Sequence, residues 1–181
     1  MAEHDLVIGG SGMLSGLVET LARQGRRVSV VARGASRLQR LAARHPYINP
    51  LQLDYDDGAT FEAGLARAVR DHGPFRRCVS WMHGDSKDNA LRIAQQVGDL
   101  YCAVLGSASA DPGQPERLAE WFDLFKPMRP KLRLTVLGFI VEGGSSRWLT
   151  DDEISAGVAR ALESEDPVTI VGTVKPWSAR P

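Results

Sequence analysis

The chain has 181 residues, of which 43% are hydrophobic and 24% charged, and its 22 basic residues balance its 22 acidic ones. This composition is typical of a soluble globular protein that is long enough for one well-buried domain and too short for two ordinary ones. The balanced charge excludes a general attraction to nucleic acid or to an anionic membrane surface, and no apolar run approaches the length of a bilayer span.

The N-terminal residues lead directly into a strand, so we expect no signal peptide and a cytoplasmic location. The two cysteines, Cys78 and Cys102, stand in separate apolar runs without metal-ligand spacing. We therefore expect buried free thiols and no metal site.

Short β-rich runs alternate with segments of helical periodicity along the whole chain. The predicted strands cover residues 6–8, 27–33, 48–54, 77–82, 101–106, 132–140 and 168–174. The helical segments are 13–21, 36–45, 61–69, 89–97, 118–125 and 151–162. This alternation predicts one α/β domain over residues 1–181, a doubly wound parallel sheet of about seven strands with helices on both faces. Ligands of such a sheet bind beyond the carboxyl ends of its strands.

A glycine-rich loop follows the first strand and precedes the first helix. It reads either as Gly10-x-Gly12-x-x-Ser15 or as Gly9-x-x-Gly12-x-x-Ser15, and both spacings let a pyrophosphate approach the bare backbone at a helix N-terminus. The strand before it and the helix after it favour a dinucleotide cradle over a simple turn. The candidate cofactor-binding residues here are Gly9, Gly10, Ser11, Gly12, Met13 and Leu14, although the side chains of the last two fit the core better.

Basic residues follow the second strand, where an NAD site usually has a carboxylate for the ribose 2′-hydroxyl. Arg33, Ser36 and Arg37 are suited instead to a 2′-phosphate, so we expect the cofactor to be NADP(H). Arg40 fits a solvated helix face. After the third strand, Asp54 either accepts from the adenine amino group or caps the next helix, and Tyr55 adjoins it.

Several motifs resemble the short-chain dehydrogenase/reductase superfamily, in particular its divergent or atypical members. They are "VIGGSGMLSG", "VVAR" and "LDYDD" at these spacings, and more loosely "VLGSAS". The segment "LGFIVEGGSSRWLTDDEISAGV" is similar to a small bacterial subgroup. The resemblance implies binding of NAD(P)(H) and redox chemistry on a small carbonyl-type substrate.

The chain departs from this family in its catalytic residues. Ser107 stands where the family has a serine after the fifth strand, but the Tyr-x-x-x-Lys pair is missing. Lys does not follow four residues after Tyr47, Tyr55 or Tyr101. The usual proton donor is therefore absent.

Three alternatives stay open. His83, with Asp85 and Lys87 nearby, could act as the acid beside Ser107, since histidine titrates near neutrality. An imine substrate would need little acid catalysis. Lastly, the chain could bind NADP(H) without turnover, as a sensor or partner subunit.

The segment after the sixth strand offers two candidate substrate residues, Arg147 and Trp148. Thr150 and Glu153 form the pattern of a capping box, so Trp148 also fits a hydrophobic staple in front of that helix, which is the role we favour. A bulky stripe of Trp121, Phe122 and Phe125 predicts either a buried helix face or the seam of a homodimer.

Overall fold

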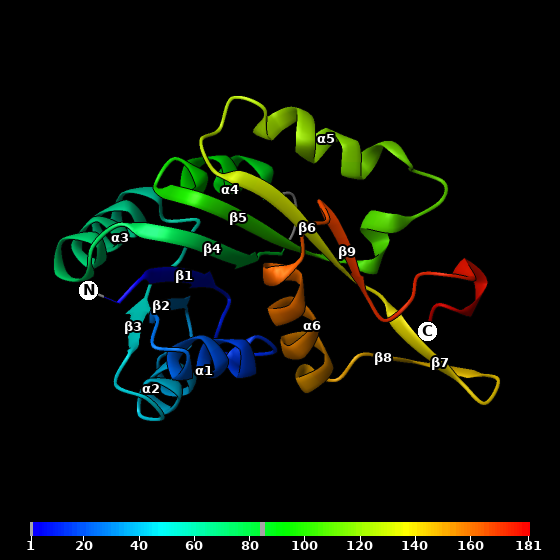
Figure 1. Ribbon diagram of the computed structural model, residues 1–181, viewed down its shortest axis with the longest axis horizontal. Helices are drawn as coiled ribbons and strands as arrows, with labels where there is room; N and C mark the ends of the chain where they lie inside the picture. Colours follow the sequence, from blue (N-terminus) through cyan, green and yellow to red (C-terminus); the bar gives the residue numbers. More distant parts are fainter. Residues whose placement is uncertain (1, 84–85) are drawn as a thin grey trace.

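The computed structural model describes residues 2–83 and 86–181, so Asp85 lies outside the described residues. Seven parallel strands form one sheet in the order β3-β2-β1-β4-β5-β6-β9, which confirms the predicted doubly wound parallel sheet (Figure 1). The strands are β1 (His4–Ile8), β2 (Arg27–Ala32), β3 (Ile48–Gln52), β4 (Phe75–Trp81), β5 (Val97–Gly106), β6 (Lys131–Leu137) and β9 (Val168–Val171). The strand order reverses between β1 and β4.

Three helices cover each face of the sheet (Figure 1). One layer contains α1 (Ser15–Arg23), α2 (Ala35–Ala42) and α6 (Asp151–Glu163), and the other contains α3 (Gly58–His72), α4 (Lys87–Ala94) and α5 (Glu116–Phe125). Successive side chains of β1 pack on opposite faces of the sheet. Val7 belongs to the core cluster on one face, and Leu6 and Ile8 belong to the cluster on the other face. Burial on both faces explains why the strand is a continuous apolar run. No helix in the described ranges combines the length and the apolar composition that a membrane span requires.

The chain leaves the sheet at Gly138, where the sequence predicted a continuous strand to residue 140. A Cβ at Gly138 would lie 2.1 Å from the carbonyl oxygen of Thr173, so only glycine allows this close approach. An antiparallel hairpin follows, with β7 (Phe139–Glu142) and β8 (Ser145–Trp148). Its turn is Gly143–Gly144, both at positive φ (59° and 81°), a hairpin signal that the sequence carries but that our prediction did not use.

The capping box of α6 is confirmed. Thr150 Oγ1 accepts from the Glu153 N–H, and the Glu153 carboxylate accepts from the Thr150 N–H at 2.8 Å. Arg147 donates to both oxygens of that carboxylate, at 2.9 and 3.0 Å. These bonds, that from Arg147 first, lower the pKa of Glu153 to about 2. Arg147 therefore supports the helix N-terminus.

The staple role that we favoured for Trp148 is wrong. Its side chain is 47% exposed, and it stands two residues before Thr150. Leu149, directly before the cap, packs instead against the core cluster that contains Ile154. In a hydrophobic staple, the side chain of the residue directly before the N-cap packs against the fourth residue of the helix.

Both cysteines are free and buried, as the sequence predicted. Burial raises the pKa of Cys102 to about 11. Its thiol is therefore protonated at neutral pH and serves as a small apolar side chain.

Candidate functional site

Three cavities open at the carboxyl ends of the strands, where ligands of this sheet type bind. The loop cleft, about 220 Å³, lies between the glycine-rich loop and the end of β2. The helix cavity, about 590 Å³, lies between β5, α4 and α5. The tail cavity, about 230 Å³, lies between the end of β5, the β7–β8 region and the C-terminal segment. All three share one lining residue, Trp81 at the end of β4.

Trp81 spans the edge of the sheet at the point of strand-order reversal. A Cβ at Gly9, beyond β1, would lie 3.5 Å from its Cδ1, and a Cβ at Gly106, at the end of β5, would lie 3.9 Å from its Cη2. The indole therefore stands between the loop cleft and the tail cavity. Our sequence prediction did not single out this residue.

The glycine-rich loop forms one wall of the loop cleft. Gly9 has φ +77°, and a Cβ there would meet the Trp81 carbonyl oxygen at 2.6 Å. Gly10 is packed against valine side chains, with Val30 only 2.7 Å from the position of a Cβ. At Gly12, by contrast, a Cβ would meet no atom within 4 Å. The first two glycines therefore shape the loop, and the third leaves open space in front of it.

The backbone of this loop has free hydrogen-bond donors. Gly9 N–H donates to Val31 O and Ser15 N–H to Gly12 O, both at 2.9 Å. In the described part of the chain, the N–H groups of residues 10–14 meet no backbone acceptor. Ser155 of α6 fixes the loop by donating its hydroxyl to Met13 O at 2.8 Å. This is the arrangement that binds an anion at a helix N-terminus.

The sequence favoured the core for the side chains of both Met13 and Leu14, and the structure places only Leu14 fully there. Met13 lines the cleft. The side chain of Leu14 is fully buried in the core cluster, so a side-chain contact of Leu14 with a cofactor is excluded. Only its N–H can belong to the cradle.

The opposite wall of the loop cleft is basic. Arg33 and Arg37 line it, and no Asp or Glu does so among the described residues. Among the described residues, Arg33 has one carboxylate within ion-pair distance, that of Asp54 at 4.0 Å, and the two side chains are 67% and 40% exposed. Ser36 does not line the cleft, and its hydroxyl accepts a hydrogen bond from Arg40 on the next turn of α2.

Of the two candidate residues after β3, Asp54 and Tyr55, one lines the loop cleft and the other does not. Tyr55 lines the loop cleft, whereas Asp54 does not. Asp54 Oδ1 accepts from the Asp56 N–H at 3.1 Å and so forms a local turn. The alternative in which Asp54 caps the next helix is wrong, because the N-cap of α3 is Asp57.

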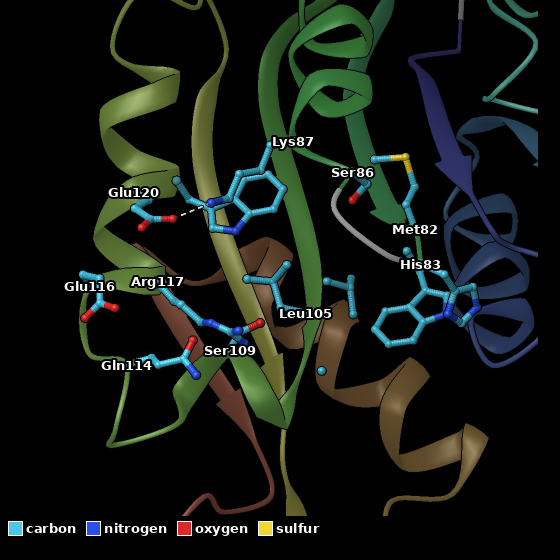
Figure 2. A pocket seen from close by; sticks show the side chains of 14 residues that line it. Met82, His83, Ser86, Lys87, Leu105, Ser109, Gln114, Glu116, Arg117 and Glu120 are labelled. Carbon is cyan, nitrogen blue, oxygen red and sulfur yellow. Dashed lines mark hydrogen bonds and ion pairs between the residues drawn. The ribbon is translucent and has the colours of Figure 1, made fainter.

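The helix cavity is the largest of the three and is mostly polar (Figure 2). Figure 2 shows the ion pair of Lys87 and Glu120, which joins α4 to α5 across it. His83 lies on the other side of the cavity. The centroid of its ring is 5.4 Å from that of Trp81, in an edge-on arrangement. Its backbone N–H donates to the Tyr55 hydroxyl at 3.4 Å. His83 lines both this cavity and the loop cleft.

The tail cavity contains Ser107, which is 4% exposed. Its Oγ accepts from Nε of Arg180 at 2.8 Å. The guanidinium of Arg180 also lies over the rings of Trp148 and Trp177, with centroid distances of 5.2 and 5.3 Å. Trp148 thus lines a cavity, as proposed from the sequence, while Arg147 does not.

The two predicted catalytic residues do not meet. Ser107 lines only the tail cavity, and His83 only the other two, with Trp81 between them. Our hypothesis of one site containing both is therefore not supported by this arrangement. Arg180, which does touch Ser107, was not among the predicted residues.

The aromatic stripe of α5 faces the core. Trp121 and Phe125 are 7% and 5% exposed, and both belong to the cluster under α3 and α4. Of the two alternatives for this stripe, the buried helix face is the one found. A homodimer stays a prediction.

No family model and no curated protein matches the sequence. Solved structures are similar across nearly the whole chain. A short-chain dehydrogenase from Bacillus anthracis has a TM-score of 0.74 at 13% identity, covering 96% of each chain. One from Streptomyces avermitilis has 0.70 at 17%, covering 95% of this chain and 89% of that one.

A third similar structure is an actinorhodin polyketide ketoreductase variant with NADPH, with a TM-score of 0.68 at 14% identity, covering 96% of this chain and 97% of that one. At such identities the likeness concerns the fold. The chain therefore has the Rossmann-like α/β fold of the short-chain dehydrogenase/reductase structures.

Proposed function

We propose that the protein binds NADP(H) in the loop cleft and acts as an atypical short-chain dehydrogenase/reductase, reducing a small carbonyl or imine substrate. One observation carries this proposal: the cleft combines an open glycine loop with two arginines, and no described carboxylate lines it. A carboxylate would favour the 2′-hydroxyl of NAD, whereas guanidinium groups favour a 2′-phosphate.

The residues present fit such a cofactor. The free N–H groups of the loop, beside the open space at Gly12, would hold the pyrophosphate. Arg33 and Arg37 would hold the 2′-phosphate, and Tyr55 lines the same cleft. When bound, NADPH supplies the hydride for the reduction.

Ser107 is the residue that we assign to the substrate. Its oxygen already accepts from Arg180, so its own O–H group is left to donate to a substrate oxygen or nitrogen. Tyr101 cannot replace the missing tyrosine, because it is fully buried in the core cluster between β5 and the layer of α3, α4 and α5. Burial also raises the pKa of Tyr101 well above its usual value.

Replacing Arg33 with alanine should weaken NADPH binding by about tenfold to a hundredfold, which corresponds to the loss of a charge-assisted hydrogen bond. Affinity for NADH should not change, because NADH has no 2′-phosphate. Fluorescence titration with both cofactors measures the difference.

Arg40→Ala is the matched control for this experiment. Arg40 carries the same charge on α2 but bonds to Ser36 outside the cleft, so it should leave both affinities unchanged. If the wild-type protein binds NADH as tightly as NADPH, the assignment of the 2′-phosphate site is wrong.

Trp81 favours a second candidate function, NADP(H) binding without turnover. Its indole stands between the loop cleft and the cavity that contains Ser107, and it would separate a bound dinucleotide from the substrate. NADPH oxidation assayed against aldehydes, ketones and cyclic imines distinguishes the two functions. Tight NADPH binding without oxidation of any of them would favour the sensor.

A further inference from the structure

Arg180 is held in place by three contacts from three different parts of the chain. Its Nε donates to Ser107 at the end of β5, and its guanidinium lies over Trp148 of β8 and over Trp177 of the C-terminal turn, η2 (Trp177–Ala179). Cation–π contacts of this kind orient a guanidinium without neutralising it. The result is a positioned cation at the wall of the tail cavity.

No Asp or Glu side chain of the described residues lies within ion-pair distance of this guanidinium. Arg180 forms no ion pair there, in contrast to Arg147, which is paired with Glu153. No described Asp or Glu lines the tail cavity, and its other walls include Leu137, Leu149 and Ile154. A guanidinium has five N–H donors, and the contact with Ser107 uses one of them.

Arg180 is an exposed residue whose guanidinium closes one side of a largely apolar cavity, and its spare N–H donors there favour an anion such as a carboxylate. The Nη groups belong to the same planar group as the Nε that contacts Ser107. A carboxylate oxygen that accepts from the Nη group on the same edge of the guanidinium as Nε would lie beside the Ser107 hydroxyl, with the adjoining carbon close to it. This spacing suits a molecule in which the carboxylate and the reacting carbonyl are on neighbouring carbons.

We propose that Arg180 binds the carboxylate of the substrate, and that the substrate class is a 2-oxo acid. This inference rests on the proposed function. In the reduction, bound NADPH would supply the hydride for the new C–H bond at C2, and the π electron pair of the C=O group would move onto its oxygen. A proton from water completes the 2-hydroxy acid, leaving NADP⁺, while Ser107 donates a hydrogen bond to that oxygen.

Calorimetry of phenylpyruvate binding to the protein saturated with NADP⁺ tests the subsite without turnover, since both molecules are oxidised. Arg180→Gln should weaken this binding by about tenfold to a hundredfold. The methyl ester of phenylpyruvate, which lacks the charge, should bind the wild type and the variant equally. With NADPH, the variant should show a raised KM for phenylpyruvate and an unchanged affinity for NADPH.

Lys175→Gln is the matched control, because Lys175 is an exposed cation of the same segment that lines none of the three cavities. It should bind phenylpyruvate like the wild type. Equal affinity in the Arg180→Gln variant would overturn the proposal. Equal or tighter binding by a chain that ends at Lys175 would also overturn it, because the segment would then only cover the cavity.

The same titration separates this proposal from the proposed function. If NADP⁺ does not bind at all, the proposed function fails, and phenylpyruvate is titrated into the protein alone. Binding that Arg180→Gln abolishes would then support the anion subsite by itself, and binding that it leaves unchanged would overturn it.

Discussion

Valine at position 12 is expected to weaken NADPH binding by about a hundredfold or more, or about 2.7 kcal/mol, while leaving the protein folded. A Cβ at Gly12 meets no atom within 4 Å, and its φ is not positive, so the fold tolerates a side chain there. The added methyl groups would fill the space in front of the free N–H groups, which a pyrophosphate needs to approach. NADPH titration and thermal unfolding of the same variant measure both effects.

Gly10→Val is the matched control two residues away. Its Cβ would lie 2.7 Å from Val30 and 2.9 Å from Val7, so this variant should lower the unfolding midpoint. The Gly10→Val variant tests whether the glycine shapes the loop, and the Gly12→Val variant tests whether the cofactor lies against the loop. Wild-type affinity for NADPH in the Gly12→Val variant would show that the pyrophosphate does not lie on this loop.

The sheet could be predicted because its signals are local. The apolar strands and the periodic helices alternate along the chain, and burial on both faces, as of Leu6, Val7 and Ile8, leaves a continuous apolar run. The loop at Gly9–Gly12 could also be predicted from a local signal, because the strand, the turn and the helix follow one another in the sequence. The hairpin at Gly143–Gly144 was equally local, and it was missed by extending the sixth strand too far.

The composition of the tail cavity and the place of Trp81 could not be predicted, because they depend on contacts between distant segments. Ser107 and Arg180 are 73 residues apart, and nothing near Arg180 in the sequence indicates that it returns to the sheet edge. Trp81 ends an ordinary strand, and only the reversal of strand order places its indole between two cavities. His83 and Ser107 both follow strands, but they line different cavities, so the sequence did not show which cavity each residue belongs to.

Replacing Asp5 with alanine is expected to lower the free energy of unfolding by about 3 to 5 kcal/mol, the usual effect of removing one partner of a buried ion pair. Asp5 is 2% exposed, and its carboxylate accepts from Arg26 and from Arg77, which lies opposite it in the register of β1 and β4. Without it, two guanidinium groups that are each only 15% exposed lose their shared buried carboxylate and keep only the exposed Glu3 and Glu163 as partners. Urea unfolding followed by circular dichroism measures the loss.

Glu19→Ala is the control that isolates burial as the cause. Glu19 also pairs with two arginines, Arg23 and Arg44, but the side chains of these arginines are 65% and 57% exposed. The free energy of unfolding should therefore fall by less than about 1 kcal/mol. Asp5 lies near the amino end of β1, whereas the cavities open at the carboxyl ends. The Asp5→Ala protein that remains folded should therefore bind NADPH like the wild type, and a change in that affinity would mean that the network also shapes the site.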